Sequence, residues 1–211
     1  MDHGYQGSWT AIFGLVVAGA AIFLGLAWSC STGHRRPPNS VFAIGTLKSL
    51  GTFQEDFKGQ VLVDQDRDGV GEYGTFQELA GCAPCRGTGI IADPTLMSAN
   101  FGTTAAAGVR GEANRSGYCF LIYLPDADGT PMPEAVALAR GMRPEAADRQ
   151  EASWVAYAWP ISDLSGDRVF ATTGPGRMFE LVEAADRFVG TDAIPPGDAL
   201  EDGWQPMEVG R

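Results

Sequence analysis

The chain has 211 residues, and its 26 acidic and 15 basic side chains give a formal net charge of −11. This charge disfavours binding to nucleic acid through a basic patch, because phosphate affinity depends on clustered Lys and Arg. The two histidines, His3 and His34, lie on either side of an apolar segment, and residues 35–211 contain no histidine. Histidine-dependent catalysis and histidine-bound catalytic metals therefore have no place in the remaining residues, and we predict that the protein is not an enzyme.

The first predicted element is an apolar segment from Trp9 to Trp28 that contains no charged residue. A helix of this length spans about 30 Å, the thickness of the hydrocarbon core of a bilayer, and Trp is enriched at both membrane interfaces. We predict a transmembrane helix over residues 9–29, in contact with membrane lipid through residues 9–28. A cleaved signal peptide is the alternative, but residues 1–8 lack the basic residues that such a signal carries.

Two features of the sequence disagree on the orientation in the membrane. Arg35 and Arg36 follow the apolar segment, and the positive-inside rule would hold the residues after them in the cytoplasm. Beyond Arg36, however, Lys occurs only at positions 48 and 58, and the chain carries an acidic loop typical of calcium sites. Because calcium is plentiful outside the cytoplasm, we favour a single-pass protein of the cell membrane whose C-terminal domain is exported to the periplasm or the exterior.

The domain boundaries follow from composition. The consecutive prolines Pro37 and Pro38 cannot continue a helix, so residues 30–39 are predicted to be a linker. The residues after it suffice for one hydrophobic core. We therefore predict an N-terminal flank over 1–8, the membrane helix over 9–29, a globular domain over 40–194 and an acidic irregular tail over 195–211.

Hydrophobic periodicity predicts the elements of the globular domain. A helix begins at Asn39 or Ser40 and runs to about Phe57, because apolar residues recur at helical spacing along it. A surface excursion with a short helix is expected from Met132 to Ala152. Segments rich in aromatic and β-branched residues predict strands at Gly117–Pro125, Ala152–Ile161, Arg168–Thr173 and Arg177–Val182. This order of elements predicts an α+β fold in which a helix packs on an antiparallel sheet.

The strongest chemical motif is an acidic loop over residues 64–72, in which three carboxylates alternate and a glycine follows. Calcium prefers six to eight oxygen ligands, and alternate Asp side chains on a tight loop converge on one point. The twelfth position of an EF-hand would be Thr75 instead of a bidentate Glu, so we predict a calcium loop of another kind. An acidic Asp–Gly turn without an ion is the alternative. The predicted ligands are Asp64, Asp66, Asp68, the Val70 carbonyl, Glu72 and Glu78.

The cysteines allow several interpretations. The pair Cys82 and Cys85 has the C-x-x-C spacing of a redox dithiol, of half a zinc site or of a local disulfide. The surrounding sequence lacks a βαβ pattern, and a zinc ion would lack ligands. For an exported domain we predict a disulfide between Cys82 and Cys85. Cys119 lies in an apolar strand and is predicted to be a buried thiol.

Two further patterns concern side-chain placement. In a strand, Tyr157 and Trp159 share one face, whereas Trp154 and Ala156 share the other, which favours core packing over ligand stacking. The segment 126–129, Asp-Ala-Asp-Gly, carries too few carboxylates for an ion and predicts a β-turn.

Several segments together resemble a known family. Residues 40–50 resemble the segment that continues a pilin helix after its membrane portion, and the acidic loop ends in Gly-Glu-Tyr-Gly at residues 71–74. Residues 116–120, 154–160 and 166–170 extend the likeness over about half of residues 40–175. On these motifs the chain resembles type IV pilin-like and type II secretion pseudopilin-like proteins of the divergent planctomycete type. The prepilin signature of a basic leader and a cleavage glycine is absent from it.

The resemblance implies a long helix packed on an antiparallel sheet, assembly into fibres or a secretion pseudopilus, and in some members a calcium site in the loops. We therefore expect a membrane-anchored, exported structural or assembly protein with a calcium-stabilised loop. Its expected partners are further copies of itself or components of a pseudopilus or secretion system. The alternative is a monomeric, membrane-anchored envelope binding module whose partner docks on the sheet or on the acidic loops.

Overall fold

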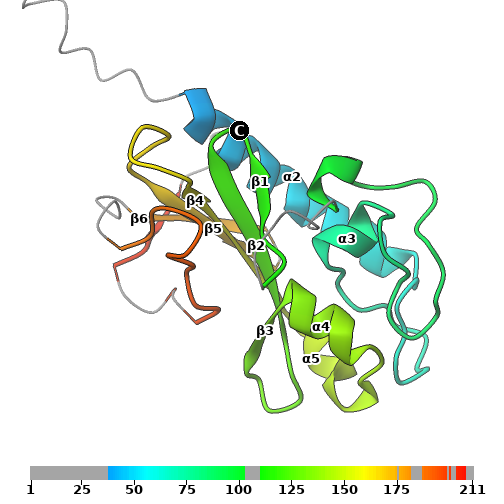
Figure 1. The fold of residues 1–211 in the computed structure, drawn as a ribbon. Coiled ribbons are helices and arrows are strands. Elements are labelled where there is room, and N and C mark those ends of the chain that lie inside the picture. The colour runs from blue at the N-terminus through cyan, green and yellow to red at the C-terminus, as the bar shows by residue number, and fades with distance from the viewer. Residues whose placement is uncertain are drawn as a thin grey trace, which may run out of the picture. The chain divides into compact units, whose positions relative to one another are not determined.

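A computed structural model describes residues 38–102, 110–174, 176–181, 187–198, 200 and 203–207. Figure 1 shows that these residues combine an antiparallel sheet with helices, which confirms the predicted α+β class. Among them, no helix is both long enough and apolar enough to cross a membrane. The predicted membrane segment and most of the predicted linker lie outside the described residues.

The first described helix, α2 (Pro38–Gly59), confirms the predicted helix and extends it by about two residues at its C-terminal end. It begins at Pro38, so residues 38–39 of the predicted linker are helical, because proline is tolerated in the first turn of a helix. One face of α2 packs into the core through four fully buried side chains, those of Ala43, Leu47, Leu50 and Phe57. The amide of Gln54, also fully buried, forms two hydrogen bonds with the backbone of Gly74, at 2.7 and 2.8 Å. These bonds fix α2 to the segment that follows the acidic loop.

Within the described residues the sheet has seven antiparallel strands. Six follow the order β1-β2-β4-β5-β6-β7, and β3 pairs with β2 on the same side of β2 as β1. The four long strands match the predicted ones, with one to three residues trimmed at some ends. The strands are β1 (Ala113–Arg115), β2 (Tyr118–Pro125), β3 (Pro131–Pro133), β4 (Val155–Pro160), β5 (Val169–Thr173), β6 (Arg177–Leu181) and β7 (Gln205–Pro206).

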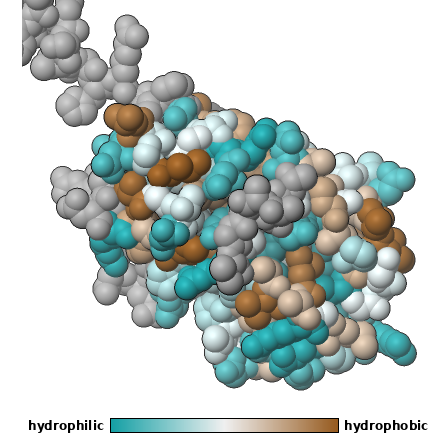
Figure 2. Space-filling model, viewed as in Figure 1, coloured by the Kyte–Doolittle hydropathy of each residue, from teal (hydrophilic) through white to brown (hydrophobic). Residues whose placement is uncertain are grey.

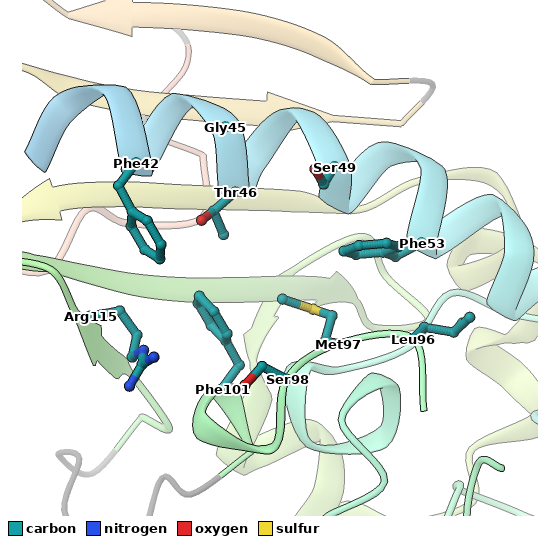
Figure 3. A pocket seen from close by; sticks show the side chains of 10 residues that line it. All are labelled: Phe42, Gly45, Thr46, Ser49, Phe53, Leu96, Met97, Ser98, Phe101 and Arg115. Atoms are coloured by element: carbon teal, nitrogen blue, oxygen red, sulfur yellow. The ribbon is translucent and has the colours of Figure 1, made fainter. Parts of the chain in front are cut away.

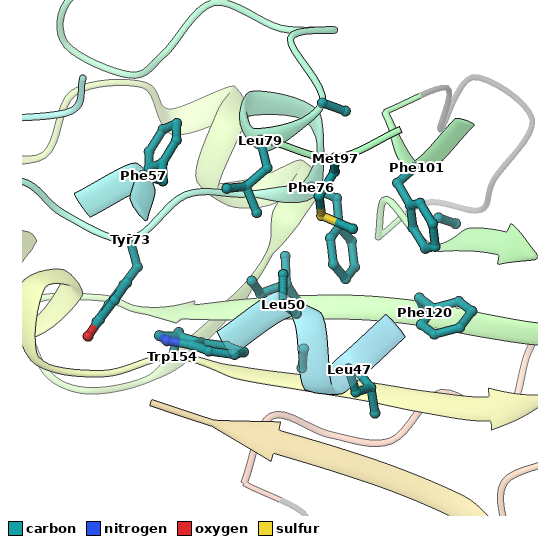
Figure 4. Close-up of a cluster of buried hydrophobic side chains, with 14 of the residues drawn as sticks. Leu47, Leu50, Phe57, Tyr73, Phe76, Leu79, Met97, Phe101, Phe120 and Trp154 are labelled. Carbon is teal, nitrogen blue, oxygen red and sulfur yellow. The ribbon is translucent and has the colours of Figure 1, made fainter. Parts of the chain in front are cut away.

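The two faces of the sheet carry separate hydrophobic clusters. Side chains of β2 alternate between them, so Phe120 and Ile122 face α2 whereas Leu121 and Tyr123 face the other way. Figure 4 shows Leu47 and Leu50 of α2 packed among the aromatic and aliphatic side chains of the first cluster. The sequence predicted that the aromatic side chains around β4 lie on opposite faces of the sheet, and this is confirmed. Trp154 belongs to the first cluster, whereas Tyr157 and Trp159 belong to the second.

The second face of the sheet is covered by the C-terminal segment. Trp204 packs against Tyr157 with ring centroids 5.7 Å apart, and β7 pairs with β6 at the edge of the sheet. Part of the segment predicted to be an irregular acidic tail therefore belongs to the fold. The physical reason is that the second face exposes large aromatic side chains unless another segment covers them.

Short helices connect the strands and position the site. They are α3 (Phe76–Leu79), η1 (Ala99–Phe101), α4 (Glu134–Arg140), η3 (Pro144–Ala146) and α5 (Ala147–Ala152). The predicted excursion between Met132 and Ala152 is thus helical in large part, and it is not confined to the surface. Ala137, Ala146, Ala147 and Gln150 are buried in it.

Candidate metal centre

The acidic loop begins at Asp64, shortly after α2 ends at Gly59, and hydrogen bonds to its own side chains hold its shape. Asp66 and Asp68 each accept a hydrogen bond from the backbone N–H two residues later, at 3.2 and 2.7 Å. Asp64 accepts one from the N–H of Gly69 at 3.3 Å. Gly69 has a φ of +88°, a backbone conformation that residues other than glycine rarely adopt. The local sequence therefore places the three aspartates around one turn.

The loop brings the predicted aspartates together. Asp64, Asp66 and Asp68 each offer one carboxylate oxygen, and these oxygens lie within 4.8 Å of one another. A calcium ion about 2.4 Å from each ligand needs ligand oxygens at separations up to this size. The three side chains therefore fit one ion, which we call the loop position.

A second set of carboxylates lies beside the first. Oxygens of Asp66, Glu72 and Glu151 also lie within 4.8 Å of one another, so Asp66 belongs to both sets. Glu72 is fully buried, and its Oε1 accepts the backbone N–H of Gln65 at 2.8 Å. Glu151 comes from α5, far from the loop in sequence, and no spacing or composition in the sequence identified it as a candidate ligand. Only the packing of α5 against the loop brings it there.

Three carboxylate oxygens of these two sets are buried without a hydrogen-bond partner among the described residues. They are Asp64 Oδ1, Glu72 Oε2 and Glu151 Oε1. A buried charged oxygen without a partner is costly, so a native structure normally supplies a donor, a water or an ion. The donor set consists of hard oxygens, which matches calcium or magnesium rather than a soft metal.

The pKa values of the two glutamates reflect the same crowding. Burial raises the pKa of Glu72 above its ordinary value, although the N–H of Gln65 and the Arg86 guanidinium oppose the shift. Burial also raises the pKa of Glu151, and the carboxylates of Asp68 and Asp66 add to the effect. Ionisation of these two glutamates is therefore disfavoured while no cation lies beside them.

Glu78 was predicted as a ligand, and the structure places it elsewhere. Its carboxylate accepts the N–H of Thr75 at 2.9 Å, while the Thr75 hydroxyl accepts the N–H of Glu78, which forms a capping box at α3. Glu78 also forms a buried ion pair with Arg86 at 3.0 Å. Because this carboxylate is already paired and bonded, it does not close the calcium loop. The role of the Val70 carbonyl stays a prediction.

A buried polar network connects the loop to α5. Arg86 donates from Nη1 to the side chain of Gln150 at 2.6 Å and from Nη2 to the carbonyl of Tyr73 at 2.7 Å. Gln65 of the acidic loop donates to the same Gln150 oxygen at 3.0 Å. Gln150 directly precedes Glu151, so this network explains why Glu151 lies against the loop.

The cysteines differ from the prediction in part. Cys82 and Cys85 are free thiols in the structure, so the predicted disulfide is not formed. Cys82 is exposed and its Sγ lies 3.6 Å from the carbonyl oxygens of Ala80 and Ala99, whereas Cys85 turns into the hydrophobic core. Cys119 is buried as predicted, and burial raises the pKa of its thiol to about 12.

A groove of about 510 Å³ lies between one side of α2 and the segment 96–101, and Arg115 of β1 also lines it. Figure 3 shows Phe42, Thr46 and Phe53 of α2 on one wall, opposite Met97 and Phe101. Phe42 is 38 % exposed, and Val41 beside it is 64 % exposed. Figure 2 shows apolar surface near the start of α2 within an otherwise mixed surface. The groove is therefore a second candidate site, for an apolar partner.

Both faces of the central strands are occupied by the chain itself. β2 is buried from Tyr118 to Leu124, and β4 is buried from Ala156 to Pro160. A partner that docks on the sheet, as one alternative supposes, would have to displace these contacts, whereas the acidic loop and the groove are exposed. In comparisons with protein families, characterised proteins and solved structures, no match to this chain is found.

Proposed function

We propose that the protein is a membrane-anchored, exported structural or assembly protein of pseudopilin-like architecture, with an acidic loop stabilised by calcium. In this proposal residues 9–29 anchor the chain in the membrane and residues 40–194 form the exported domain. The helix α2, packed lengthwise on an antiparallel sheet, supports the likeness to pilins that the sequence motifs suggested. The protein has no catalytic role in this proposal.

The groove along α2 is the observation that carries an assembly role. Phe42 and Phe101 from its two walls each pack edge-on against Phe120 of β2, with ring centroids 6.4 and 5.4 Å apart. Aromatic side chains are thus ordered along an apolar surface that remains partly exposed. We assign this groove to a second copy of the chain, because anchoring of several copies in one membrane would raise the local concentration of these apolar surfaces.

Self-association is tested with a matched pair of variants on α2. Ser49 is exposed and lines the groove, whereas Thr52 is exposed on α2 outside it. We expect the full chain in detergent to form oligomers, Ser49→Lys to weaken them at least tenfold, and Thr52→Lys to leave them unchanged, as measured by analytical ultracentrifugation. A monomeric full chain would contradict the assembly role and favour the binding module whose partner docks on the acidic loop.

The calcium part of the proposal is tested by stability. An ion that binds the folded state alone raises the free energy of unfolding by about 2.7 kcal/mol at a concentration one hundred times its dissociation constant. We expect millimolar calcium to raise the melting temperature of chelator-treated protein. Asp64→Ala combined with Asp68→Ala should remove the part of this rise that comes from an ion held by the three aspartates. If the wild-type melting temperature stayed constant, the loop would be an acidic turn.

A further inference from the structure

The buried end of the acidic loop differs from its exposed end. Asp66 and Asp68 lie at the surface, but Glu72 has an exposed fraction of 0 % and its Oε2 lacks a partner among the described residues. The Oε1 atom of Glu151 is also buried without a hydrogen-bond partner among the described residues. Oxygens of these two glutamates and of Asp66 converge within 4.8 Å. A fully buried carboxylate with one unpartnered oxygen therefore lies close to two other carboxylates.

Two basic side chains near this cluster, those of Arg86 and Lys58, already donate hydrogen bonds to other groups. The three side-chain nitrogens of Arg86 donate hydrogen bonds to Glu78, to Gln150 and to the carbonyl of Tyr73. The ammonium of Lys58 donates to the backbone carbonyl of Glu151 at 2.5 Å and lies 5.1 Å from the centre of the Tyr73 ring. The ion pairs among the described residues include none with Asp66, Glu72 or Glu151. Arg86 and Lys58 attract Glu72 and Glu151 only at longer range, so the cluster lacks a direct ion pair among the described residues.

We propose that Asp66, Glu72 and Glu151 form a second cation position, the inner position, which shares Asp66 with the loop position. Its ligands are carboxylate oxygens only, so it takes a hard divalent cation, and calcium fits best because it tolerates irregular geometry and bidentate carboxylates. The two positions together contain five carboxylates, and two divalent cations bring the net charge of this cluster from −5 to −1. A single ion at the loop position would leave Glu72 and Glu151 without a directly bound cation.

The inner position gives the second ion a structural role. Asp66 and Glu72 belong to the loop that follows α2, whereas Glu151 belongs to α5, which leads directly into β4. An ion between them fastens the loop to α5 beside the hydrogen bond that joins Gln65 to Gln150. This inference goes beyond the proposed function and does not depend on self-association, because every residue it uses lies within one chain.

The number of bound ions tests the proposal. The full chain in detergent is freed of metal with a chelator and titrated with calcium in equilibrium dialysis. We expect two ions per wild-type chain and one in Glu151→Gln. We also expect one in Asp68→Ala, which lacks the loop position. The control Asp148→Asn removes one negative charge from the exposed side of the same helix, and it should still bind two.

Stability provides a readout that a merely structural role of Glu151 would not reproduce. In chelator, Glu151→Gln should melt at a higher temperature than wild type, because it removes a charge that has no direct ion pair. In calcium the order should reverse, because the variant lacks the inner ion. A single ion in wild type, or two ions in Glu151→Gln, would overturn the inner position. Either result leaves the ultracentrifugation test of assembly unaffected, so failure of this inference and failure of the proposed function are distinguishable.

Discussion

Arg86 is the residue on which the buried polar groups beside the acidic loop depend. Its side chain is 2 % exposed, and its ion pair with the fully buried Glu78 is supported by bonds to Gln150 and Tyr73. Removal of one partner of a buried pair leaves the other charge without compensation. Loss of Arg86 would therefore destabilise the protein chiefly because Glu78 would stay buried without an ion-pair partner.

Replacement of Arg86 tests this directly. We expect Arg86→Met to lower the free energy of unfolding by about 3–5 kcal/mol, because Glu78 would stay buried and unpaired. Urea denaturation followed by circular dichroism measures the change. The partly exposed pair of Arg168 and Glu180 serves as the control, since Arg168→Gln should cost at most about 1 kcal/mol. Equal losses in both variants would show that the burial of the first pair has no special cost.

Glu134 gives the stability a dependence on pH. Its carboxylate is fully buried and accepts the N–H groups of Phe76 and Gln77 at 3.0 and 3.1 Å. Burial nevertheless raises the pKa of Glu134 to about 8, from 4.5. Between these two pH values the folded chain holds a proton that the unfolded chain has released. The free energy of unfolding should therefore fall as pH rises from 4.5 to about 8.

The variant Glu134→Gln isolates this contribution. It lacks the titrating group, so its free energy of unfolding should depend less steeply on pH than that of wild type over this window. Each pKa unit corresponds to about 1.4 kcal/mol, which makes the expected difference in slope measurable by urea denaturation at several pH values. Asp148→Asn, on the exposed side of α5, is the control for loss of one carboxylate. Parallel pH profiles for Glu134→Gln and wild type would contradict the prediction.

The candidate ligands show what single residues reveal in the sequence. The alternating aspartates at 64, 66 and 68 were predictable, because their spacing alone brings them to one turn. From spacing, Glu78 was as good a candidate ligand as Glu72. Its carboxylate instead accepts the N–H of Thr75 and forms an ion pair with Arg86. Glu151 could not be predicted, since its place at the loop depends on tertiary packing of a short helix.

At the scale of elements, α2 shows how a glycine can be either a weakness or a requirement. Gly45 lies at the exposed wall of the groove, and a Cβ added there would meet no atom within 4 Å. Gly51 faces the β5–β6 hairpin, and a Cβ added there would lie 3.1 Å from the Cα of Gly176. Helix propensity favours Ala over Gly at both positions, but only Gly45 has room for it.

The two glycines predict opposite outcomes for the same substitution. Gly45→Ala should raise the free energy of unfolding by about 0.5–1 kcal/mol, because it lowers the backbone entropy of the unfolded chain. Gly51→Ala should gain less or destabilise the protein, because the hairpin must move by a few tenths of an ångström. Thermal unfolding of both variants measures the difference. A larger gain from Gly51→Ala would show that α2 and the hairpin are not in close contact.

The strands and α2 were predictable because their signals are local. Hydrophobic periodicity of 3.6 marks α2, and aromatic, β-branched runs bounded by glycines mark β2, β4, β5 and β6. The edge strand β7 has only two residues, Gln205 and Pro206, and carries no such signal. It forms because the neighbouring residues of the C-terminal segment pack on the aromatic side chains of the second face. Those side chains come together only in the assembled sheet, so the sequence does not indicate this contact.

At the scale of the whole molecule, the sheet is stable only if both of its faces are covered. On the second face the polar tips of three aromatic side chains hold the C-terminal segment. Tyr123 donates to the carbonyl of Pro195 at 2.8 Å, Tyr157 to that of Gly197 at 3.2 Å, and Trp159 to that of Gly190 at 2.9 Å. The segment is thus bonded to the sheet as well as packed on it.

Truncation therefore has an outcome that the composition of this segment would not suggest. A chain that ends at Leu181 should fail to unfold cooperatively, because loss of the cover exposes several large aromatic side chains and the total stability of a domain is only about 5–15 kcal/mol. Trp204→Ala keeps the segment and should cost about 2 kcal/mol, since Trp204 is half-buried against Tyr157. A chain that ends at Met207 retains β7 and Trp204, and it should unfold like the full chain. Urea denaturation followed by tryptophan fluorescence compares the three, and a cooperative, stable chain ending at Leu181 would show that the second face does not need its cover.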